Sequence, residues 1–315
     1  MRIGSSRMLV RTASSATTVL LAGGLLFAGT GAATALDFGS LATGSSGSLG
    51  TGSSSTPIDP TDRLASIANF RDVGGNEGHG YAIGFGQHLK RGVVYRANAL
   101  SSATDADLQT LTDLGLISVL DMRGQSEIDN PFVGGPDKIP AGADYSHIPI
   151  EFGDLVQLAQ TIQSPEQGRQ YMVDANRSFV TDPLKRAAFK QVLTDIADAP
   201  GPAVFHCSAG KDRTGWVAAL LQQIGGASAD TVMADYLLSN DYLAGVNART
   251  LAQISGALGE QAALNLTPVL GVDASYLEAG LAQIRADYGN VLGYLTDGLG
   301  LDTGTLAKLA IKMRA

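Results

Sequence analysis

The chain of 315 residues has very little cysteine and tryptophan, with one of each at Cys207 and Trp216. A single cysteine excludes an intramolecular disulfide and any zinc site made of several thiolates. The histidines show no metal-ligand spacing either, and they stand at positions His79, His88, His147 and His206. The sequence therefore predicts no metal and no cofactor, and a core that holds together without a disulfide.

Positive charge is also scarce. Lysine and arginine number 22 against 30 acidic residues, the formal net charge is −8, and no long basic run occurs. Such a chain is poorly suited to bind the phosphate backbone of DNA or RNA, so we expect no nucleic-acid partner. An acidic surface also repels small phosphates, so a phosphate site would depend on a few local cations.

The first 35 residues have the three parts of a secretory signal peptide. Arg2, Arg7 and Arg11 precede a stretch of small and apolar residues from Ala16 to Gly29, and Ala33–Ala35 fits the cleavage site. A membrane anchor is the alternative, but the apolar stretch is shorter than the roughly 20 residues that span a bilayer. We expect a protein that is secreted or in the cell envelope, with no stable membrane span after cleavage.

Residues 36–58 are dominated by glycine, serine and threonine, which cannot build a hydrophobic core. We expect a flexible linker there and a folded domain over residues 59–315. Since 44% of the whole chain is hydrophobic, this domain can bury a sizeable core.

Cys207 begins a short segment in which an arginine follows after five residues. From Val204 to Gly215 the sequence is Val-Phe-His-Cys-Ser-Ala-Gly-Lys-Asp-Arg-Thr-Gly. The apolar run Pro202–Phe205 predicts a strand before the segment, and the pattern from Thr214 to Ile224 predicts a helix after it. A strand that leads through a compact loop into a helix N-terminus directs several backbone N–H groups at one point, which creates an anion site.

An anion site also stabilises a thiolate, because N–H groups and cations lower the pKa of a cysteine from about 8.5 toward roughly 4–7. Arg213 can hold two phosphate oxygens with its planar guanidinium. Gly210 allows the loop to wrap closely around a ligand, and Thr214 can donate its hydroxyl to the sulfur. A buried, inert cysteine is the alternative, but the flanking residues favour catalysis.

The motif His-Cys-x5-Arg-Thr-Gly resembles the signature of the protein-tyrosine-phosphatase superfamily. Its form from His206 to Arg213 is similar to that of the atypical bacterial tyrosine/serine and phosphoinositide phosphatases, and the resemblance runs from about Ala65 to the C-terminus. Asn69–Gly75 (Asn-Phe-Arg-Asp-Val-Gly-Gly) resembles the opening motif of that family, although no chemical role for it follows from the sequence. The resemblance implies phosphoryl transfer through a phosphocysteine.

The predicted catalytic residues are Cys207, Arg213, Asp212 and Asp121. The predicted substrate-binding residues are His206, Ser208, Ala209, Gly210, Lys211, Thr214 and Arg123. The resemblance implies both Asp212 and Asp121 as candidates for the general acid that protonates the leaving oxygen, and the sequence does not choose between them. For Asp121 a turn carboxylate is the alternative.

Apolar runs at Val93–Arg96, Leu116–Leu120 and Pro202–Phe205 predict strands, with helical patterns between them. This alternation predicts an α/β fold with a mostly parallel central sheet flanked by helices. Ligands of such sheets bind at the carboxyl ends of the strands. Asp121 and Arg123, which follow the second run, should therefore lie beside the cysteine loop.

Two further helical patterns occupy residues 240–289, at about 241–258 and 273–289. A helical lid shields the active site in a member of the resembling family, so this pair is a candidate lid. It would also protect the thiol from oxidation outside the cytoplasm. An ordinary helical extension of the core is the alternative.

Together these patterns predict a secreted phosphatase that acts on phosphotyrosine, with phosphoserine, phosphothreonine and phosphoinositides as further candidate substrates. The alternatives are an enzyme acting chiefly on phosphoinositides and a non-catalytic phosphate-binding module. Lys211 would suit a substrate with several phosphates, unless it is merely solvated. Intact Cys207 and Arg213, with two candidate acids, argue against the binding module.

Overall fold

A computed structural model describes residues 64–315 apart from residues 76–77, 131–133 and 154. The predicted signal peptide and linker lie outside the described residues. The strands are β1 (Arg71–Asp72), β2 (Ala82–Gly84), β3 (Gln87–His88), β4 (Val94–Ala97), β5 (Ser118–Asp121), β6 (Asp144–His147) and β7 (Ala203–His206). The helices are α1 (Asp105–Asp113), α2 (Gln125–Ile128), α3 (Leu155–Thr161), α4 (Pro165–Thr181), α5 (Pro183–Asp198), α6 (Arg213–Gly225), α7 (Ala229–Leu237), α8 (Ser239–Leu258), α9 (Glu260–Leu270), α10 (Ala274–Tyr288), α11 (Val291–Gly293), the π-helical turn η2 (Tyr294–Gly298) and α12 (Thr303–Met313).

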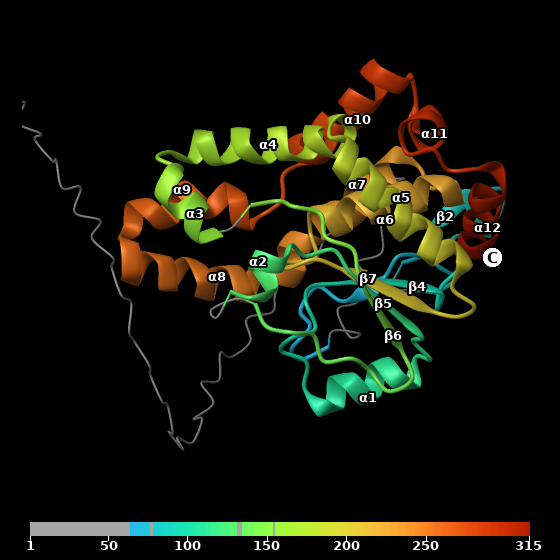
Figure 1. Ribbon diagram of the computed structural model, residues 1–315, viewed down its shortest axis with the longest axis horizontal. Helices are drawn as coiled ribbons and strands as arrows, with labels where there is room; N and C mark the ends of the chain where they lie inside the picture. Colours follow the sequence, from blue (N-terminus) through green and yellow to red (C-terminus); the bar gives the residue numbers. More distant parts are fainter. Residues whose placement is uncertain (1–63, 76–77, 131–133, 154) are drawn as a thin grey trace, which may run out of the picture. The chain divides into compact units, whose positions relative to one another are not determined.

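The central sheet has the strand order β1-β4-β7-β5-β6. Strands β4, β7, β5 and β6 run parallel, and β1 is antiparallel to β4. Strands β2 and β3 form a separate hairpin. A mostly parallel sheet with helices around it confirms the predicted α/β class (Figure 1).

The register of the sheet gathers three chain segments at the end of β7. His206, the last residue of β7, is aligned with Ala97 of β4 on one side and with Asp121 of β5 on the other. The whole of β7 is buried, as expected for a central strand covered on both faces. The loop that begins at Cys207 therefore emerges between the ends of β4 and β5.

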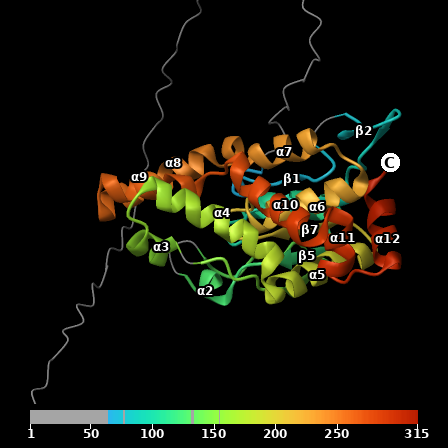
Figure 2. The same ribbon diagram turned by 90° about the horizontal axis from the view of Figure 1, so that it is seen from above.

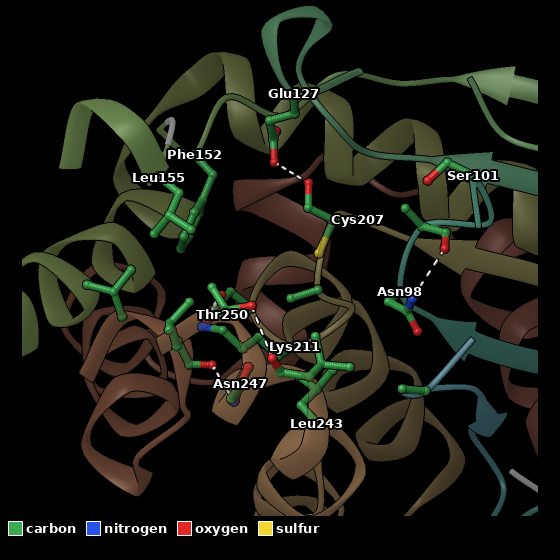
Figure 3. A pocket seen from close by; sticks show the side chains of 18 of the residues that line it. Asn98, Ser101, Glu127, Phe152, Leu155, Cys207, Lys211, Leu243, Asn247 and Thr250 are labelled. Carbon is green, nitrogen blue, oxygen red and sulfur yellow. Dashed lines mark hydrogen bonds and ion pairs between the residues drawn. The ribbon is translucent and has the colours of Figure 1, made fainter. Parts of the chain in front are cut away.

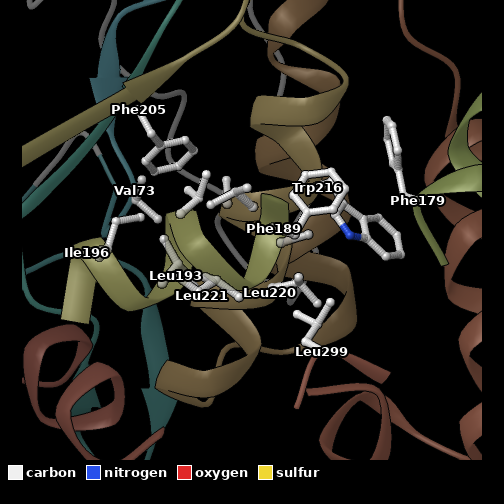
Figure 4. Packing of buried hydrophobic residues seen from close by; sticks show 14 of the residues in the cluster. Val73, Phe179, Phe189, Leu193, Ile196, Phe205, Trp216, Leu220, Leu221 and Leu299 are labelled. Carbon is white, nitrogen blue, oxygen red and sulfur yellow. The ribbon is translucent and has the colours of Figure 1, made fainter. Parts of the chain in front are cut away.

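Helix α6, which follows this loop, is anchored in the main core. Phe205 of β7 packs there with α6 and α5 residues, including Phe189 and Leu193 (Figure 4). The indole ring of Trp216 lies 5.8 Å from the ring of Phe179 and 5.9 Å from that of Tyr294, measured between centroids. Because α6 is apolar on nearly all sides, it is buried over most of its length.

Residues 240–289 contain three helices rather than the two predicted. Helix α9 was missed because Pro268 suggested a break, whereas this proline lies in the last turn of α9. Helices α8 and α9 pack against each other. In space they lie on the opposite side of the described domain from α12 (Figures 1 and 2). Helix α10 instead packs on α4 and contributes Leu277 and Ile284 to the main core. No described helix has the length and apolar character needed to cross a membrane.

The packing of α10 on α6 can be tested at Gly280. An added Cβ there would approach Cζ3 of Trp216 to 2.5 Å, so Gly280→Ala should destabilise the fold by about 1–3 kcal/mol. Gly256 in α8 is a matched control, because its surface is exposed and an added Cβ would meet no atom within 4 Å. Gly256→Ala should stabilise the fold by about 0.5–1 kcal/mol. Urea unfolding measures both, and equal effects would contradict the proposed contact.

Candidate active site

A cavity of about 530 Å³ borders the loop Cys207–Arg213. From this loop, Cys207, Ser208 and Ala209 line it. One side is formed by the segment after β4, with Asn98 and Ser101, and another by α8 and α9. Figure 3 shows Glu127 and Lys211 on opposite sides of Cys207, and Phe152 and Leu155 to one side. The other lining residues are Ala65, Ser66, Ala68, Ala99, Ser102, Asn130, Gly153, Leu158, Asp212, Arg213, Leu243, Val246, Asn247, Arg249, Thr250, Val269 and Leu270.

Hydrogen bonds to its carbonyl groups fix the orientation of the loop backbone. Seven consecutive carbonyls, from His206 to Asp212, each have a hydrogen-bond partner. The partners are the N–H groups of Met122, Ala99, Gly215 and Trp216, the ring of His206, and the side chains of Asn69 and Arg96. Among the described residues, none accepts a hydrogen bond from the N–H groups of Ser208 to Arg213. Because C=O and N–H point in opposite directions across a trans peptide, these N–H groups are available to an anion.

Gly210 is required by this loop conformation. Its φ is +68°, and a Cβ at this position would lie 2.2 Å from the carbonyl oxygen of Ala97. Any other residue would therefore be strained and would also clash with β4. Gly210 is not among the residues that line the cavity, and it contributes through the shape of the loop and its backbone N–H group.

The sulfur of Cys207 is surrounded by groups that stabilise a thiolate. Thr214 donates its hydroxyl to the sulfur over 3.3 Å, and helix α6 begins immediately after the loop, at Arg213. The positive end of the helix dipole and the guanidinium both favour a negative sulfur. Burial lowers the pKa of Arg213, but the charges of Cys207 and Glu127 raise it well above its ordinary value.

Glu127 in α2 is the main partner of Arg213, and no sequence pattern predicted it. The two side chains form a bidentate pair with both N–O distances at 2.6 Å. Glu127 Oε1 also accepts a hydrogen bond from Ser208 Oγ over 2.5 Å. One carboxylate therefore joins the two ends of the loop. Burial raises the pKa of Glu127, but its hydrogen bond and charge interaction with Arg213 lower it below the ordinary value.

Further contacts fix the guanidinium plane of Arg213. Its Nη1 donates to the carbonyls of Met122 over 3.1 Å and Ile150 over 2.9 Å. The guanidinium carbon lies 5.2 Å from the ring centroid of Phe152. A fixed plane is useful because a guanidinium binds two phosphate oxygens only when its fork faces them.

Lys211 and Asp212 line the cavity as a pair. Lys211 Nζ lies 2.7 Å from Asp212 Oδ2, and the two residues are 4% and 5% exposed. The other oxygen, Asp212 Oδ1, is buried and has no hydrogen bond to a described residue. Asp212 therefore presents a carboxyl oxygen that is not committed to the surrounding protein.

Asp121, Arg123 and His206 do not line the cavity. Arg123 Nη2 lies 2.7 Å from Asp121 Oδ2 and 2.9 Å from Asp137 Oδ2, and Tyr145 donates its hydroxyl to Asp121 over 2.9 Å. His206 Nε2 lies 2.9 Å from Asp137 Oδ2. Successive side chains of an extended strand point to opposite sides, which turns His206 away from the sulfur. The segment after β5 does lie beside the loop, as expected, but its backbone makes the contact.

Charge interactions in this buried cluster shift two pKa values. Burial raises the pKa of Asp121, but His206 and Arg123 lower it to about 2. Burial lowers the pKa of His206, but its hydrogen bond to Asp137 and the charges of Asp137 and Asp121 raise it above the ordinary value. One oxygen or nitrogen from each of Asp121, Asp137 and His206 lies within 4.8 Å of the others, as in a metal site. Since Arg123 already bridges the two carboxylates, this donor set does not fit a metal ion.

Residues 63–315 match the sequence model of a tyrosine phosphatase family. A protein of Cupriavidus necator, provisionally named a tyrosine-protein phosphatase, is 34% identical over 247 residues, which cover 76% of this chain and 84% of the relative. The triple specificity protein phosphatase PtpB of Mycobacterium tuberculosis is 31% identical over 276 residues, which cover 76% of this chain and 94% of PtpB. A tyrosine-protein phosphatase of Nostoc commune is 29% identical and covers 69% of this chain and 73% of the relative. These matches confirm the resemblance read from the signature, and the chain belongs to the tyrosine phosphatase family.

Proposed function

We propose that this protein is a cysteine-dependent phosphatase that hydrolyses phosphotyrosine through a phosphocysteine on Cys207. The observation that carries the proposal is the loop itself, in which the carbonyls are held outward and six N–H groups are left available beside a buried thiol. A binding module would not need the hydroxyl of Thr214 on the sulfur. That hydrogen bond stabilises a thiolate as it leaves phosphorus in the second step.

The first step forms a sulfur–phosphorus bond and breaks the bond from phosphorus to the tyrosine oxygen. The Cys207 thiolate attacks while Arg213 and the loop N–H groups stabilise charge on the three equatorial oxygens. A general acid gives the leaving oxygen its proton. In the second step water attacks phosphorus, the same carboxylate takes a proton from the water, and inorganic phosphate and the thiolate are released.

We assign the general acid to Asp212 rather than to Asp121. A general acid must reach the leaving oxygen. Asp121 does not line the cavity, and its carboxylate accepts hydrogen bonds from Arg123 and Tyr145. Asp212 lines the cavity and has an oxygen with no described partner. Asp121 then acts indirectly, because with Arg123 it orients the segment that bonds to the loop.

The walls of the cavity favour an aromatic phosphoester. Helices α3, α8 and α9 contribute apolar side chains there, namely Leu155, Leu158, Leu243, Val246, Val269 and Leu270. We propose that α8 and α9 act as the lid, whereas α10 belongs to the core. Phosphoserine, phosphothreonine and phosphoinositides remain second candidates. Lys211 and Arg249 at the cavity could meet additional phosphates, and the relative PtpB is named for three specificities.

We also propose that the protein is secreted or in the cell envelope, on the basis of residues 1–35. Export of the full chain from a bacterial host should yield a product that begins at residue 36, as read by N-terminal sequencing. A cytoplasmic product that keeps residues 1–35 would contradict export.

Replacement of the nucleophile tests the reaction itself. Cys207→Ser should abolish phosphate release from phosphotyrosine, phosphoserine and phosphoinositide substrates under reducing conditions, because a serine hydroxyl remains protonated at this site. Phosphotyrosine should rank first for the unmodified protein. Phosphoinositides ranking first would favour the lipid phosphatase, and an inactive unmodified protein would leave only the binding module.

The choice of acid predicts a dependence on the leaving group. Asp212→Asn should lower kcat/KM, which reports the step that releases the leaving group, by about 10²–10⁴-fold for a serine or alkyl phosphate, since a poor leaving group needs the proton most. The loss for a nitrophenyl phosphate should be much smaller. Asp121→Asn is the comparison, and its loss should be the same for both substrates. If Asp212→Asn lowered the activity on both substrates by the same factor, Asp212 would not be the general acid.

A further inference from the structure

The motif Asn69–Asp72, for which the sequence alone gives no chemical role, lies against the outer side of the loop. Asn69 is fully buried, and its Nδ2 donates to the carbonyl oxygens of Ala209 over 3.0 Å and Gly210 over 2.9 Å. Arg96 of β4, also fully buried, donates its Nη2 to the carbonyl of Gly210 over 2.9 Å. Most other loop carbonyls are held by backbone N–H groups. Within the part of the chain that the structure describes, the two carbonyls at the middle of the loop accept hydrogen bonds from these side chains alone.

The amide of Asn69 has only one orientation that satisfies its neighbours. Arg71 donates its Nη1 to Asn69 Oδ1, and a guanidinium can only donate. The amide oxygen must therefore face Arg71, and the amide nitrogen must face the loop. The backbone N–H of Asn69 is held by Asn98 Oδ1 over 2.9 Å, which fixes the residue on its other side.

Asp235 of α7 anchors both arginines. Its carboxylate lies 3.1 Å from Arg71 Nε and 2.7 Å from Arg96 Nη1, and it accepts a third hydrogen bond from Tyr81 over 3.1 Å. Burial raises the pKa of Asp235, but the charges of Arg71 and Arg96 lower it below the ordinary value. Two buried guanidiniums thus share one carboxylate, and one positive charge remains uncompensated within this group.

We propose that Asn69 and Arg96 are positioning residues of the phosphate site, with Arg71 and Asp235 as their supports. By holding the carbonyls of Ala209 and Gly210 outward, they aim the N–H groups of Gly210 and Lys211 at the phosphate. This inference rests on the proposed function, because it assumes that the loop binds a phosphate oxyanion.

The physical consequence concerns two peptide units rather than the whole fold. If either unit rotates, an N–H group leaves the anion site and a carbonyl oxygen with its partial negative charge takes its place. Phosphate and the Cys207 thiolate would both be destabilised, since both depend on the same N–H groups. Arg96 also places a positive charge behind the loop, which stabilises both the phosphate and the thiolate.

Asn69→Asp is the sharpest test, because it keeps the size of the side chain but replaces the NH₂ donor with an acceptor. Inorganic phosphate should bind at least about tenfold more weakly, as expected when two buried hydrogen bonds are lost. The pH midpoint for alkylation of Cys207 by iodoacetamide should rise, because the thiolate is less stabilised. Neither readout requires turnover.

Two other variants keep the test decisive if this one does not fold. Asn69→Ser removes the long donor without adding charge, and Arg96→Lys keeps the charge but loses the fork that joins Asp235 to Gly210. Asn176→Ala is the matched control, because Asn176 is also buried but donates to Met172 within α4. The control should lose thermal stability alone and keep phosphate affinity and the alkylation midpoint.

Wild-type phosphate affinity and alkylation midpoint in the folded Asn69 and Arg96 variants would overturn the inference. So would loss of folding in all three, because these residues would then be purely structural. An unmodified protein that binds phosphate but releases none from any substrate would instead contradict the proposed function and leave the positioning role intact.

Discussion

The structure depends on one constraint, which is the orientation of the peptide units between β7 and α6. Six N–H groups can serve an anion only if the carbonyls opposite them find donors elsewhere. The segments after β4 and β5 supply backbone N–H groups, and the ring of His206 bonds to the carbonyl of Cys207. Helix α6 takes the last two carbonyls into its first turn, and Asn69 and Arg96 supply the rest. The parallel sheet matters because it brings these donors to the end of one strand.

Each of the buried cations described near the site pairs with a carboxylate, and two of them share one. Arg213 pairs with Glu127, Lys211 with Asp212, Arg123 with Asp121 and Asp137, and the pair Arg71 and Arg96 with Asp235. Buried ion pairs are weak evidence for stability, because desolvation opposes the attraction between the charges. Here they fix the planes of four guanidiniums.

The sequence was informative where the site is contiguous. Cys207 to Thr214 stand in one segment, so the strand, loop and helix could be predicted from local patterns, and the alternation of elements gave the α/β class. Glu127 was missed because it lies 86 residues before its partner Arg213 and carries no motif of its own. A glutamate shortly after a predicted strand at the active edge is the signal that could have found it.

The role of Asn69 was hidden for the same reason, since 140 residues separate it from Ala209. Asp121 and His206 show the opposite limit. Sequence placed them at the correct edge of the sheet, but only the structure shows the side chain of Asp121 in a buried cluster away from the cavity. A motif gives the position of a residue along the chain, and the direction of its side chain depends on strand pleat and on partners elsewhere.

The central claim is that phosphate passes through the sulfur of Cys207. Rapid acid quenching during turnover of a nitrophenyl phosphate, followed by mass spectrometry of peptides, tests it directly, because a good leaving group makes breakdown of the intermediate the slower step. We predict one phosphoryl group on the peptide that contains Cys207, appearing within the first turnover and disappearing when substrate is exhausted. Steady phosphate release with no phosphoryl group on that peptide at any time would contradict the account.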